Sequence, residues 1–352
     1  MIEDPRVLHD GFVPREVCHR DNEVDHLSAV LAPIADGEPA DTALLTGLTG
    51  TGKTCIARFT VDRLRRTHLD VAYRYVNCWQ NGSRYRVLYR VLEALGRTID
   101  VHRRSTPHDE LTERLRAYDR PPCVVILDEA DQLDDRSVLY DLYALSGISM
   151  LLIANDTDAV LAGADERLTS RLRGREHVRF DRYGVAELTA ILAARARWGL
   201  EAGAIDRAEL ETIADAAAGD ARVAISILRS AARRATREER GRITPEIVRE
   251  AIPTARTEVH RKSLDKLSAH QRTLFEIIDA RGEIAPTDLY SAYRERVREP
   301  KTDRTVRNCL RKMGPLRPGR RRGDESRPNL SRPIGRGRPL RAMSRPENDV
   351  TS

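Results

Sequence analysis

The feature that most constrains the fold is the run G-L-T-G-T-G-K-T at residues 47–54, which matches the pattern G-x-x-x-x-G-K-[ST]. An apolar run at residues 43–45 precedes it and a helical pattern follows, which is the strand–loop–helix context of a phosphate-binding loop. In such a loop, backbone N–H groups and the start of the helix converge on phosphate oxygens. The run therefore predicts a nucleotide site, with Lys53 on the β- and γ-phosphates and Thr54 on Mg²⁺. The other loop residues assigned to this site are Gly47, Gly50, Thr51 and Gly52.

Short apolar runs alternate with helical patterns as far as residue 180. Those runs predict five strands, at Thr42–Thr46, Val71–Val76, Cys123–Leu127, Ser149–Ala154 and His177–Phe180. The third and fourth are apolar throughout, as in strands that are buried on both faces. Strands separated by helices predict an α/β fold with a parallel sheet.

Two carboxylates, Asp128 and Glu129, follow the apolar run V-V-I-L. Beside a phosphate-binding loop, the first carboxylate of such a pair holds Mg²⁺ and the second orients or deprotonates the attacking water. Taken alone, the pair could equally cap a helix. The loop at residues 47–54 is what favours an ATPase.

Asn155 closes the apolar run L-L-I-A at residues 151–154. A polar residue at the carboxyl end of a central strand lies where open α/β sheets bind their ligands. We assign Asn155 to positioning the lytic water, and an ordinary turn residue is the alternative.

The second half of the chain has a purely helical pattern. It predicts helices at Val185–Leu200, Arg207–Ala218 and Ala221–Ala235. Pro245 suits the first turn of a further helix, and Pro253 is expected to mark a boundary. Three more helices are predicted at Ser263–Ala280, Thr287–Arg298 and Asp303–Lys312, a set that suits a helix-turn-helix or winged-helix domain.

Charge is distributed unevenly along the chain. Residues 301–352 carry 15 Lys and Arg against 5 Asp and Glu, whereas residues 1–300 carry 45 basic and 49 acidic side chains. A near-neutral body with a basic end indicates a polyanionic partner. Residues 314–352 contain six Pro, five Gly and no aromatic residue, which predicts a disordered basic tail.

Several classes of protein are excluded by composition. No stretch approaches the ~18 apolar residues of a membrane-spanning helix, and the N-terminus lacks a signal pattern. The five cysteines are scattered, which argues against a disulfide framework or a zinc site. We expect a cytoplasmic, nucleoid-associated protein without a membrane partner.

Several motifs resemble a known family. The runs L-L-T-G-L-T-G-T-G-K-T, V-V-I-L-D-E-A-D-Q-L and I-A-N-D-T-D, in this order, resemble the AAA+ ATPases. The runs F-V-P-R-E (12–16), V-N-C (76–78), S-R-L-R-G (170–174) and G-D-A-R (219–222) are similar to the archaeal origin-recognition/cell-division-control replication initiators. The resemblance implies an AAA+ base (1–182), a helical lid (183–252), a winged-helix-like domain (253–313) and a basic tail (314–352).

The resemblance also implies roles for single residues. The segment Val13–Arg20 would lie over the adenine, with Val13, Pro14 and Arg15 as the assigned residues. Arg222 would contact the γ-phosphate from the lid, and Arg171 would be the arginine finger for a neighbouring subunit. Guanidinium groups suit both tasks because they bind phosphate in a bidentate manner. A solvated helix residue is the alternative for Arg222, and three nearby arginines compete with Arg171.

Two helices are candidates for DNA contact. In the family, an initiator-specific insertion that touches DNA corresponds to Ser83–Leu95, although the pattern alone fits an amphipathic helix with a solvated face. The arginines assigned there are Arg84, Arg86 and Arg90. The helix Lys301–Lys312 would enter the major groove, where arginine and asparagine suit guanine and adenine. Its assigned residues are Arg304, Arg307, Asn308 and Arg311.

The chain departs from the family after Met313. A winged helix should continue there into two strands joined by a basic hairpin, and the sequence contains no such pattern. The domain is therefore expected to be incomplete. The tail could still add salt-sensitive affinity that is independent of sequence.

We therefore expect an ATP-dependent replication-origin-binding initiator. It would bind ATP or ADP with Mg²⁺, hydrolyse ATP slowly as a switch, and help to load the replicative helicase. Other initiator subunits are further expected partners, and whether the weak ATPase counts as an enzyme is left open. The alternatives are a DNA-binding regulator or decayed paralogue without helicase loading, and a helper ATPase such as a clamp loader. A basic recognition helix counts against the last.

Overall fold

The computed structural model describes residues 1–313 apart from 69–70, 99–105, 119–121, 163 and 283. The predicted tail at 314–352, and with it the question of a wing, lies outside the described residues. The chain divides into one unit at Met1–Arg272 and a second that begins at Thr273. In the part of the chain that the structure describes, no helix is long and apolar enough to cross a membrane.

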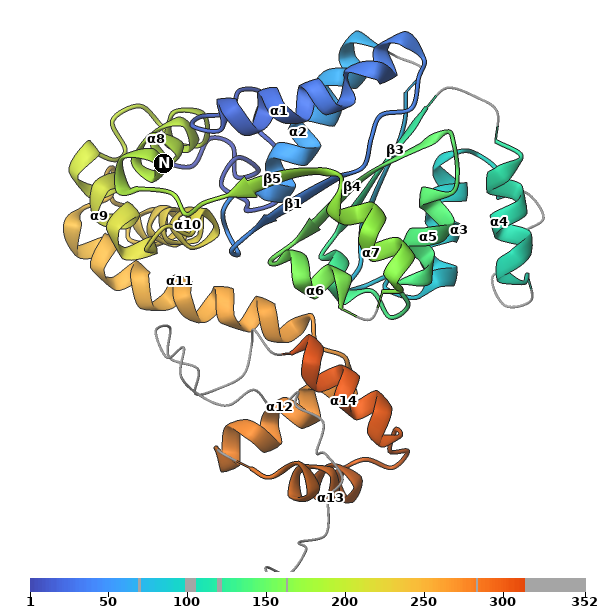
Figure 1. Cartoon of the computed structure of the whole chain (residues 1–352). Coiled ribbons are helices and arrows are strands. Elements are labelled where there is room, and N and C mark those ends of the chain that lie inside the picture. The colour runs from blue at the N-terminus through green and yellow to red at the C-terminus, as the bar shows by residue number, and fades with distance from the viewer. Residues whose placement is uncertain (69–70, 99–105, 119–121, 163, 283, 314–352) are drawn as a thin grey trace, which may run out of the picture. The chain divides into compact units, whose positions relative to one another are not determined.

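A five-stranded parallel sheet is the centre of the first unit (Figure 1). Its strands are β1 (Ala43–Gly47), β2 (Ala72–Asn77), β3 (Cys123–Asp128), β4 (Ile148–Ala154) and β5 (Glu176–Phe180), in the order β2-β3-β4-β1-β5. All four pairings are parallel, and β3 and β4 are buried along their whole length. The predicted α/β fold with a parallel sheet is therefore confirmed.

Helices cover both faces of the sheet because its central strands, β3 and β4, are apolar on both faces. Val124 and Ile126 pack in the core with α1 (Asp21–Leu31) and α2 (Lys53–Thr67). Val125 and Leu127 point to the opposite face, as the alternation of a strand requires. The helices on that side are α3 (Arg84–Ala94), α4 (His108–Arg116), α5 (Ser137–Tyr143), α6 (Thr157–Leu161) and α7 (Glu166–Arg173). Two 3-10 turns, η1 (Ala32–Asp36) and η2 (Ala130–Gln132), complete the base.

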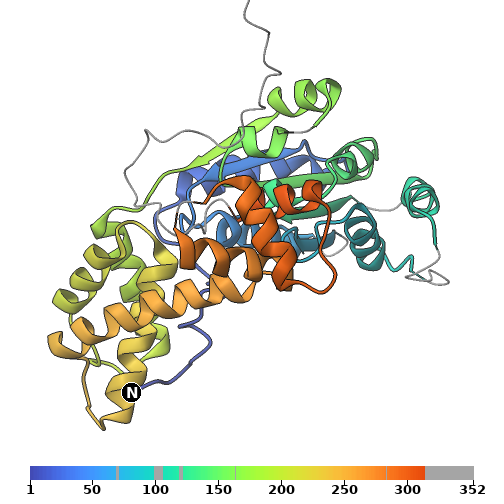
Figure 2. The same ribbon diagram turned by 90° about the horizontal axis from the view of Figure 1, so that it is seen from below.

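Four helices follow the sheet and share a core of their own. They are α8 (Val185–Gly199), α9 (Arg207–Ala217), α10 (Ala221–Arg237) and α11 (Pro245–Asp265), coloured yellow-green to orange in Figures 1 and 2. Leu192, Ile213, Leu228 and Val248 are among the buried residues of this core. The first residues of the chain pack against it through Leu8 and through a β-bridge between Ile2 and Leu200. The N-terminus therefore lies beside these helices (Figure 1).

The expected boundary at Pro253 is wrong for the helix, because α11 continues through it. An interior proline removes one backbone hydrogen bond and crowds the preceding turn. Val248 and Ala251 before the proline and Ala255 after it are all buried in the same helical core. Tertiary packing of the residues before and after Pro253 stabilises the helix, and this stabilisation cannot be predicted from local helix propensity.

The predicted helix Ser263–Ala280 is divided in two. Helix α11 ends at Asp265, and α12 (Ala269–Arg281) begins after Ser268. The backbone N–H of Ser268 donates to Oε1 of Gln271, and the N–H of Gln271 donates to the Ser268 hydroxyl, at 2.9 and 3.3 Å. This reciprocal capping box starts a new helix. The end of α11 contacts the base at this break, where the Trp79 indole N–H donates to the carbonyl of Lys266 at 2.9 Å.

The second unit consists, within residues 273–282 and 284–313, of the remainder of α12 with α13 (Pro286–Arg296) and α14 (Asp303–Lys312). Leu274, Tyr293, Val306 and Leu310 form its buried core. These described residues contain helices but no strand, so the winged helix is not confirmed. The domain boundaries given in the sequence analysis remain predictions.

Candidate nucleotide site

The loop at residues 47–54 joins β1 to α2 and depends on glycine at two positions. Gly50 and Gly52 have φ values of 80° and 94°, which other residues rarely adopt. A Cβ on Gly50 would overlap the carboxylate of Asp220, and one on Gly52 would overlap the Tyr183 hydroxyl. The Thr51 hydroxyl donates to the Leu48 carbonyl at 2.8 Å and tightens the turn. The backbone of the loop therefore packs closely against Asp220 and Tyr183.

Lys53 is the first residue of α2, and it is only 8% exposed. Its ammonium donates to the carbonyls of Gly47 and Leu48 at 2.6 and 2.7 Å. Burial lowers the pKa of Lys53 to about 8; the Asp128 carboxylate opposes this shift and the Arg222 guanidinium adds to it. A buried cation with carbonyl ligands beside a helix N-terminus suits a polyphosphate anion.

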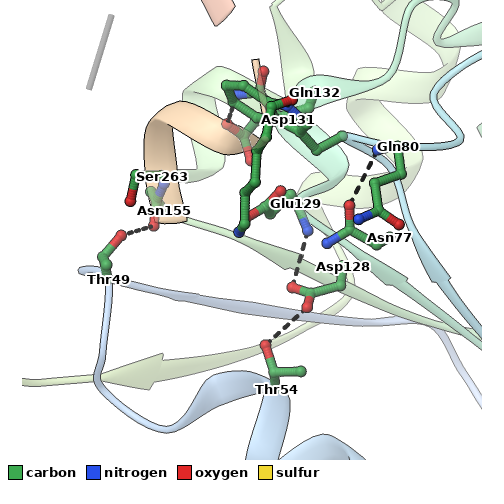
Figure 3. A network of polar contacts seen from close by, with 12 residues as sticks. Thr49, Thr54, Asn77, Gln80, Asp128, Glu129, Asp131, Gln132, Asn155 and Ser263 are labelled. Atoms are coloured by element: carbon green, nitrogen blue, oxygen red, sulfur yellow. Dashed lines mark hydrogen bonds and ion pairs between the residues drawn. The ribbon is translucent and has the colours of Figure 1, made fainter. Parts of the chain in front are cut away.

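Asp128 lies at the end of β3 and accepts three hydrogen bonds. Thr54 Oγ1 and the Tyr75 hydroxyl donate to Oδ2 at 2.9 and 2.7 Å, and the Glu129 N–H donates to Oδ1 at 3.0 Å. Figure 3 shows Asp128 between Thr54 and Glu129. The register that pairs Asn77 of β2 with Asp128 sets the position of this group. The hydroxyl and the carboxylate assigned to a metal are thus adjacent.

These donors suit Mg²⁺ bound together with a nucleotide. Mg²⁺ usually takes one or two protein carboxylates and completes its shell with phosphate oxygens and water. Among the described residues, no group of three His, Cys, Asp or Glu side chains is placed to hold a metal by itself. Thr54 and Asp128 therefore fit a Mg²⁺ site that phosphate oxygens and water complete.

Glu129 turns the chain after β3 and has a left-handed backbone, with φ 56° and ψ 46°. Its Oε1 lies 3.5 Å from the Lys266 ammonium at the end of α11. Its Oε2 is buried without a hydrogen-bond partner. Burial raises the pKa of Glu129, and Lys266 acts in the opposite direction. A carboxylate with one free oxygen at this edge of the sheet can accept a proton from water.

Asn155 follows β4, the neighbour of β1, and reaches the phosphate-binding loop. Its Oδ1 accepts a hydrogen bond from the Thr49 hydroxyl at 3.4 Å (Figure 3). The strand order brings these two residues together although they are far apart in the sequence. Asn155 is exposed at this edge, as a group that orients water has to be.

Arg222 enters the site from the start of α10. Asp220 caps this helix by accepting the N–H of Arg222 at 2.9 Å, and the Ala221 N–H donates to the Gly50 carbonyl at 3.0 Å. The Nε of Arg222 is buried without a partner. A guanidinium with unused donors beside the phosphate-binding loop can contact a γ-phosphate.

Val13, Pro14 and Arg15 lie between two anchored arginine contacts. On one side, Arg195 of α8 donates to the Phe12 carbonyl at 3.0 Å and lies 5.0 Å from the Phe12 ring. On the other side, the Arg20 side chain donates to the Asp181 carbonyl and lies 4.2 Å from the Tyr183 ring. Arg195, Asp181 and Tyr183 cannot be identified from sequence, because nothing in their local pattern separates them from ordinary surface residues.

Arg171 is exposed on α7 and makes its aromatic contacts with α5. Its guanidinium lies 5.4 Å from the Tyr140 ring and 5.3 Å from the Tyr143 ring. These contacts hold it at the surface rather than beside Lys53. A finger that serves a neighbouring subunit would have this location, and that role remains a prediction.

The arginines assigned to DNA contact on α3 are already engaged within the chain. Arg84 pairs with Asp141 at 2.6 Å, Arg90 pairs with Glu93 at 3.0 Å, and Arg86 donates to a backbone carbonyl. The pair of Arg84 is bidentate, since a second contact measures 3.0 Å. A phosphate would have to compete with these carboxylates.

The arginines of α14 are arranged differently. Arg304, Arg307 and Asn308 are exposed, whereas Val306 and Leu310 on the same helix are buried. The helix therefore has one apolar face and one basic face. The side chain of the fourth assigned residue, Arg311, lies outside the described residues.

Comparison with known families agrees with this arrangement. Residues 38–172 match the model of an AAA domain, and residues 189–253 match that of the Cdc6 AAA+ ATPase-type lid domain. The fold and the site thus define an AAA+ ATPase in which a Cdc6-type lid follows the parallel sheet.

The relatives identify the family. ORC1-type DNA replication protein 9 of Halobacterium salinarum is 52% identical over 313 residues, which cover 89% of this chain and 88% of that protein. ORC1-type DNA replication protein 1 of the same organism is 50% identical over 308 residues, 88% of this chain and 100% of the relative. The Aeropyrum pernix ORC1 protein, solved in complex with DNA, aligns with a TM-score of 0.69 and 28% identity over 90% of this chain and 88% of that one. The chain belongs to the ORC1-type DNA replication proteins.

Proposed function

We propose that this protein is a replication initiator that binds origin DNA and uses ATP as a switch. The observation that carries the proposal is the group formed by buried Lys53, the Thr54–Asp128 hydrogen bond and the free oxygen of Glu129 at one edge of the sheet. Membership of the ORC1-type family gives this nucleotide site its biological setting.

In the proposed site the phosphates of ATP take the place of the carbonyl ligands of Lys53. Mg²⁺, held by Thr54 and Asp128, would neutralise charge on the β- and γ-phosphates. Glu129 accepts a proton from the attacking water, which Asn155 orients. Arg222 binds the γ-phosphate from the lid, so that the lid contacts ATP and ADP differently.

Slow hydrolysis suits a switch better than a motor. The Lys266 ammonium lies close to Glu129, and part of the negative charge of the base is therefore already paired. Slow hydrolysis would also follow if the arginine finger that completes the site has to come from another subunit. In this proposal the ATP-bound form holds double-stranded origin DNA and helps to load the helicase, and hydrolysis ends that state.

DNA binding is assigned to α14, whose exposed face combines Arg304, Arg307 and Asn308. The relative of known structure was solved in complex with DNA, which supports DNA as the polyanionic partner. Arginine and asparagine on a helix suit base edges in the major groove. The arginines of α3 are assigned a secondary part because acidic side chains engage Arg84 and Arg90, and a backbone carbonyl engages Arg86.

The proposal is tested by selecting duplex fragments from a genomic pool with ATP, at several salt concentrations, with the full chain and two variants. The wild type should enrich one or a few fragments. Lys53→Ala should lose this enrichment because it cannot hold ATP. Glu129→Gln is the matched control, since it should keep ATP and the enrichment while hydrolysis falls by about a hundredfold or more.

The opposite result has a clear form. Uniform, salt-labile binding that Lys53→Ala leaves unchanged would overturn the initiator proposal and favour a DNA-binding regulator or decayed paralogue. Enrichment without recruitment of the replicative helicase to the same fragments would also favour the regulator.

A further inference from the structure

Tyr75 contacts the site from the neighbouring strand, and the sequence analysis assigns it no role. Its hydroxyl lies 2.7 Å from Oδ2 of Asp128, the same oxygen that accepts the Thr54 hydroxyl. Asp128 is only 7% exposed, so few other donors can reach that oxygen. The hydroxyl is therefore one of the contacts that fix the orientation of this carboxylate.

The fold holds Tyr75 in place. In the parallel register, Tyr75 of β2 is paired with Ile126 of β3, two residues before Asp128. Its ring packs against the core that includes α2, and the Arg58 guanidinium of α2 lies 5.5 Å from the ring centre. Packing against α2 and the pairing of β2 with β3 direct the Tyr75 hydroxyl to Asp128.

The hydroxyl of Tyr75 acts as a donor throughout the neutral range. An ordinary phenol keeps its proton at neutral pH, and at 2.7 Å from a carboxylate oxygen it can only be the donor. A hydrogen bond to Oδ2 restricts rotation of the Asp128 carboxylate about its Cβ–Cγ bond. If the Thr54 hydroxyl binds a metal and no longer donates to Oδ2, the Tyr75 hydroxyl still satisfies that buried oxygen.

We propose that Tyr75 is a positioning residue for Mg²⁺, because its hydroxyl holds Asp128 in the orientation that Thr54 and the metal require. This inference rests on the proposed nucleotide site. Groups that hydrogen-bond to a metal ligand commonly change metal affinity by about 10- to 100-fold when they are removed. The loss of the Tyr75 hydroxyl should therefore weaken the use of Mg²⁺ while nucleotide binding without metal persists.

The test uses the full chain and a fluorescent, non-hydrolysable ATP analogue, titrated in EDTA and over a range of Mg²⁺ concentrations. In Tyr75→Phe the Mg²⁺ concentration for half-maximal tightening should rise about tenfold, and the affinity in EDTA should stay unchanged. Tyr73→Phe is the matched control, because Tyr73 is on the same strand and packs in the same core as Tyr75. That control should behave as wild type, and the thermal midpoint of each variant is measured alongside.

The possible failures are distinguishable. No binding of the analogue by the wild type would overturn the proposed nucleotide site and this inference with it. Mg²⁺-dependent binding by the wild type that is unchanged in Tyr75→Phe would overturn the inference alone. Equal weakening with and without Mg²⁺, together with a lower thermal midpoint, would assign Tyr75 a structural role and overturn its link to the metal.

Discussion

At the scale of single residues, the site is built from charged groups that the fold has partly removed from water. The Lys53 ammonium is held by two carbonyls, Glu129 keeps one oxygen free, and Arg222 keeps a free Nε. Such groups cost free energy when they are buried without a partner of opposite charge. A bound polyphosphate with Mg²⁺ would relieve this cost, which ties ligand binding to the stability of the site.

The lowered pKa of Lys53 predicts a pH dependence for ATP binding. Below pH 8 the free protein carries the ammonium charge, and above it the lysine loses its proton. ATP binds the charged form, so a proton must be taken up on binding and affinity should fall as pH rises beyond 8. The expected loss is about tenfold per pH unit, because one unit corresponds to about 1.4 kcal/mol.

Nucleotide titrations by fluorescence between pH 7 and 9.5 would measure this effect. The phosphates of ATP do not confound it, since the second ionisation of a phosphate lies near pH 6. An affinity that stays constant across the range would show that Lys53 keeps an ordinary pKa or does not contact the nucleotide.

The residues of the site differ in how far the sequence could identify them. The motif at 47–54 and the carboxylates after β3 were found because their chemistry is encoded in short, contiguous patterns. Tyr75 and Lys266 could not be found in this way. Tyr75 reaches Asp128 through the pairing of β2 with β3, and Lys266 reaches Glu129 only because α11 ends at the base. Such contacts depend on strand pairing and on the packing of distant elements, which cannot be predicted from a single sequence.

At the scale of elements, burial decides where local rules succeed. The strands β3 and β4 were predicted closely because burial on both faces leaves an uninterrupted apolar run. Pro253 by itself indicates a helix boundary, whereas burial of Val248, Ala251 and Ala255 keeps α11 continuous through it. The break at Lys266–Ser268 was missed for the reverse reason, since its capping pair consists of two ordinary polar residues.

The course of α11 through Pro253 predicts that this proline lowers stability. Pro253→Ala should restore the interior hydrogen bond and raise the free energy of unfolding by about 1–3 kcal/mol. Pro245→Ala is the matched control, because Pro245 occupies the first turn of the same helix, where proline is tolerated. Thermal and denaturant unfolding of the two variants would measure the difference. If Pro253→Ala destabilises the protein, the helix is not continuous there in solution.

At the scale of the whole molecule, the chain separates its chemistry between two units. The nucleotide site belongs entirely to Met1–Arg272, whereas the basic helix α14 belongs to the unit that begins at Thr273. On α3, Arg84 and Arg90 are half-buried and paired with acidic side chains, and Arg86 donates to a backbone carbonyl. On α14, Arg304 and Arg307 are exposed. Net charge alone would not distinguish the two surfaces.

The salt dependence of DNA binding should separate these two groups of arginines. Removing one arginine that neutralises a DNA phosphate reduces the slope of log K against log salt by about 0.9. If Arg304 or Arg307 contacts a phosphate, its replacement by Ala should lower the slope by about this amount. If the arginine instead contacts a base, its replacement should weaken the preference for particular DNA fragments. Arg84→Ala should leave the slope unchanged because Asp141 neutralises Arg84. A reduced slope in Arg84→Ala alone would reassign the DNA surface to α3.

The contact between Trp79 and the end of α11 gives the molecule an optical reporter. The chain has two tryptophans; Trp79 donates its indole N–H to the carbonyl of Lys266, whereas Trp198 is 63% exposed on α8. Release of the end of α11 from the base should free the Trp79 indole and shift its emission to the red, whereas the emission of the exposed Trp198 should change little. Intrinsic fluorescence thus follows the departure of Lys266 from Glu129 without any label.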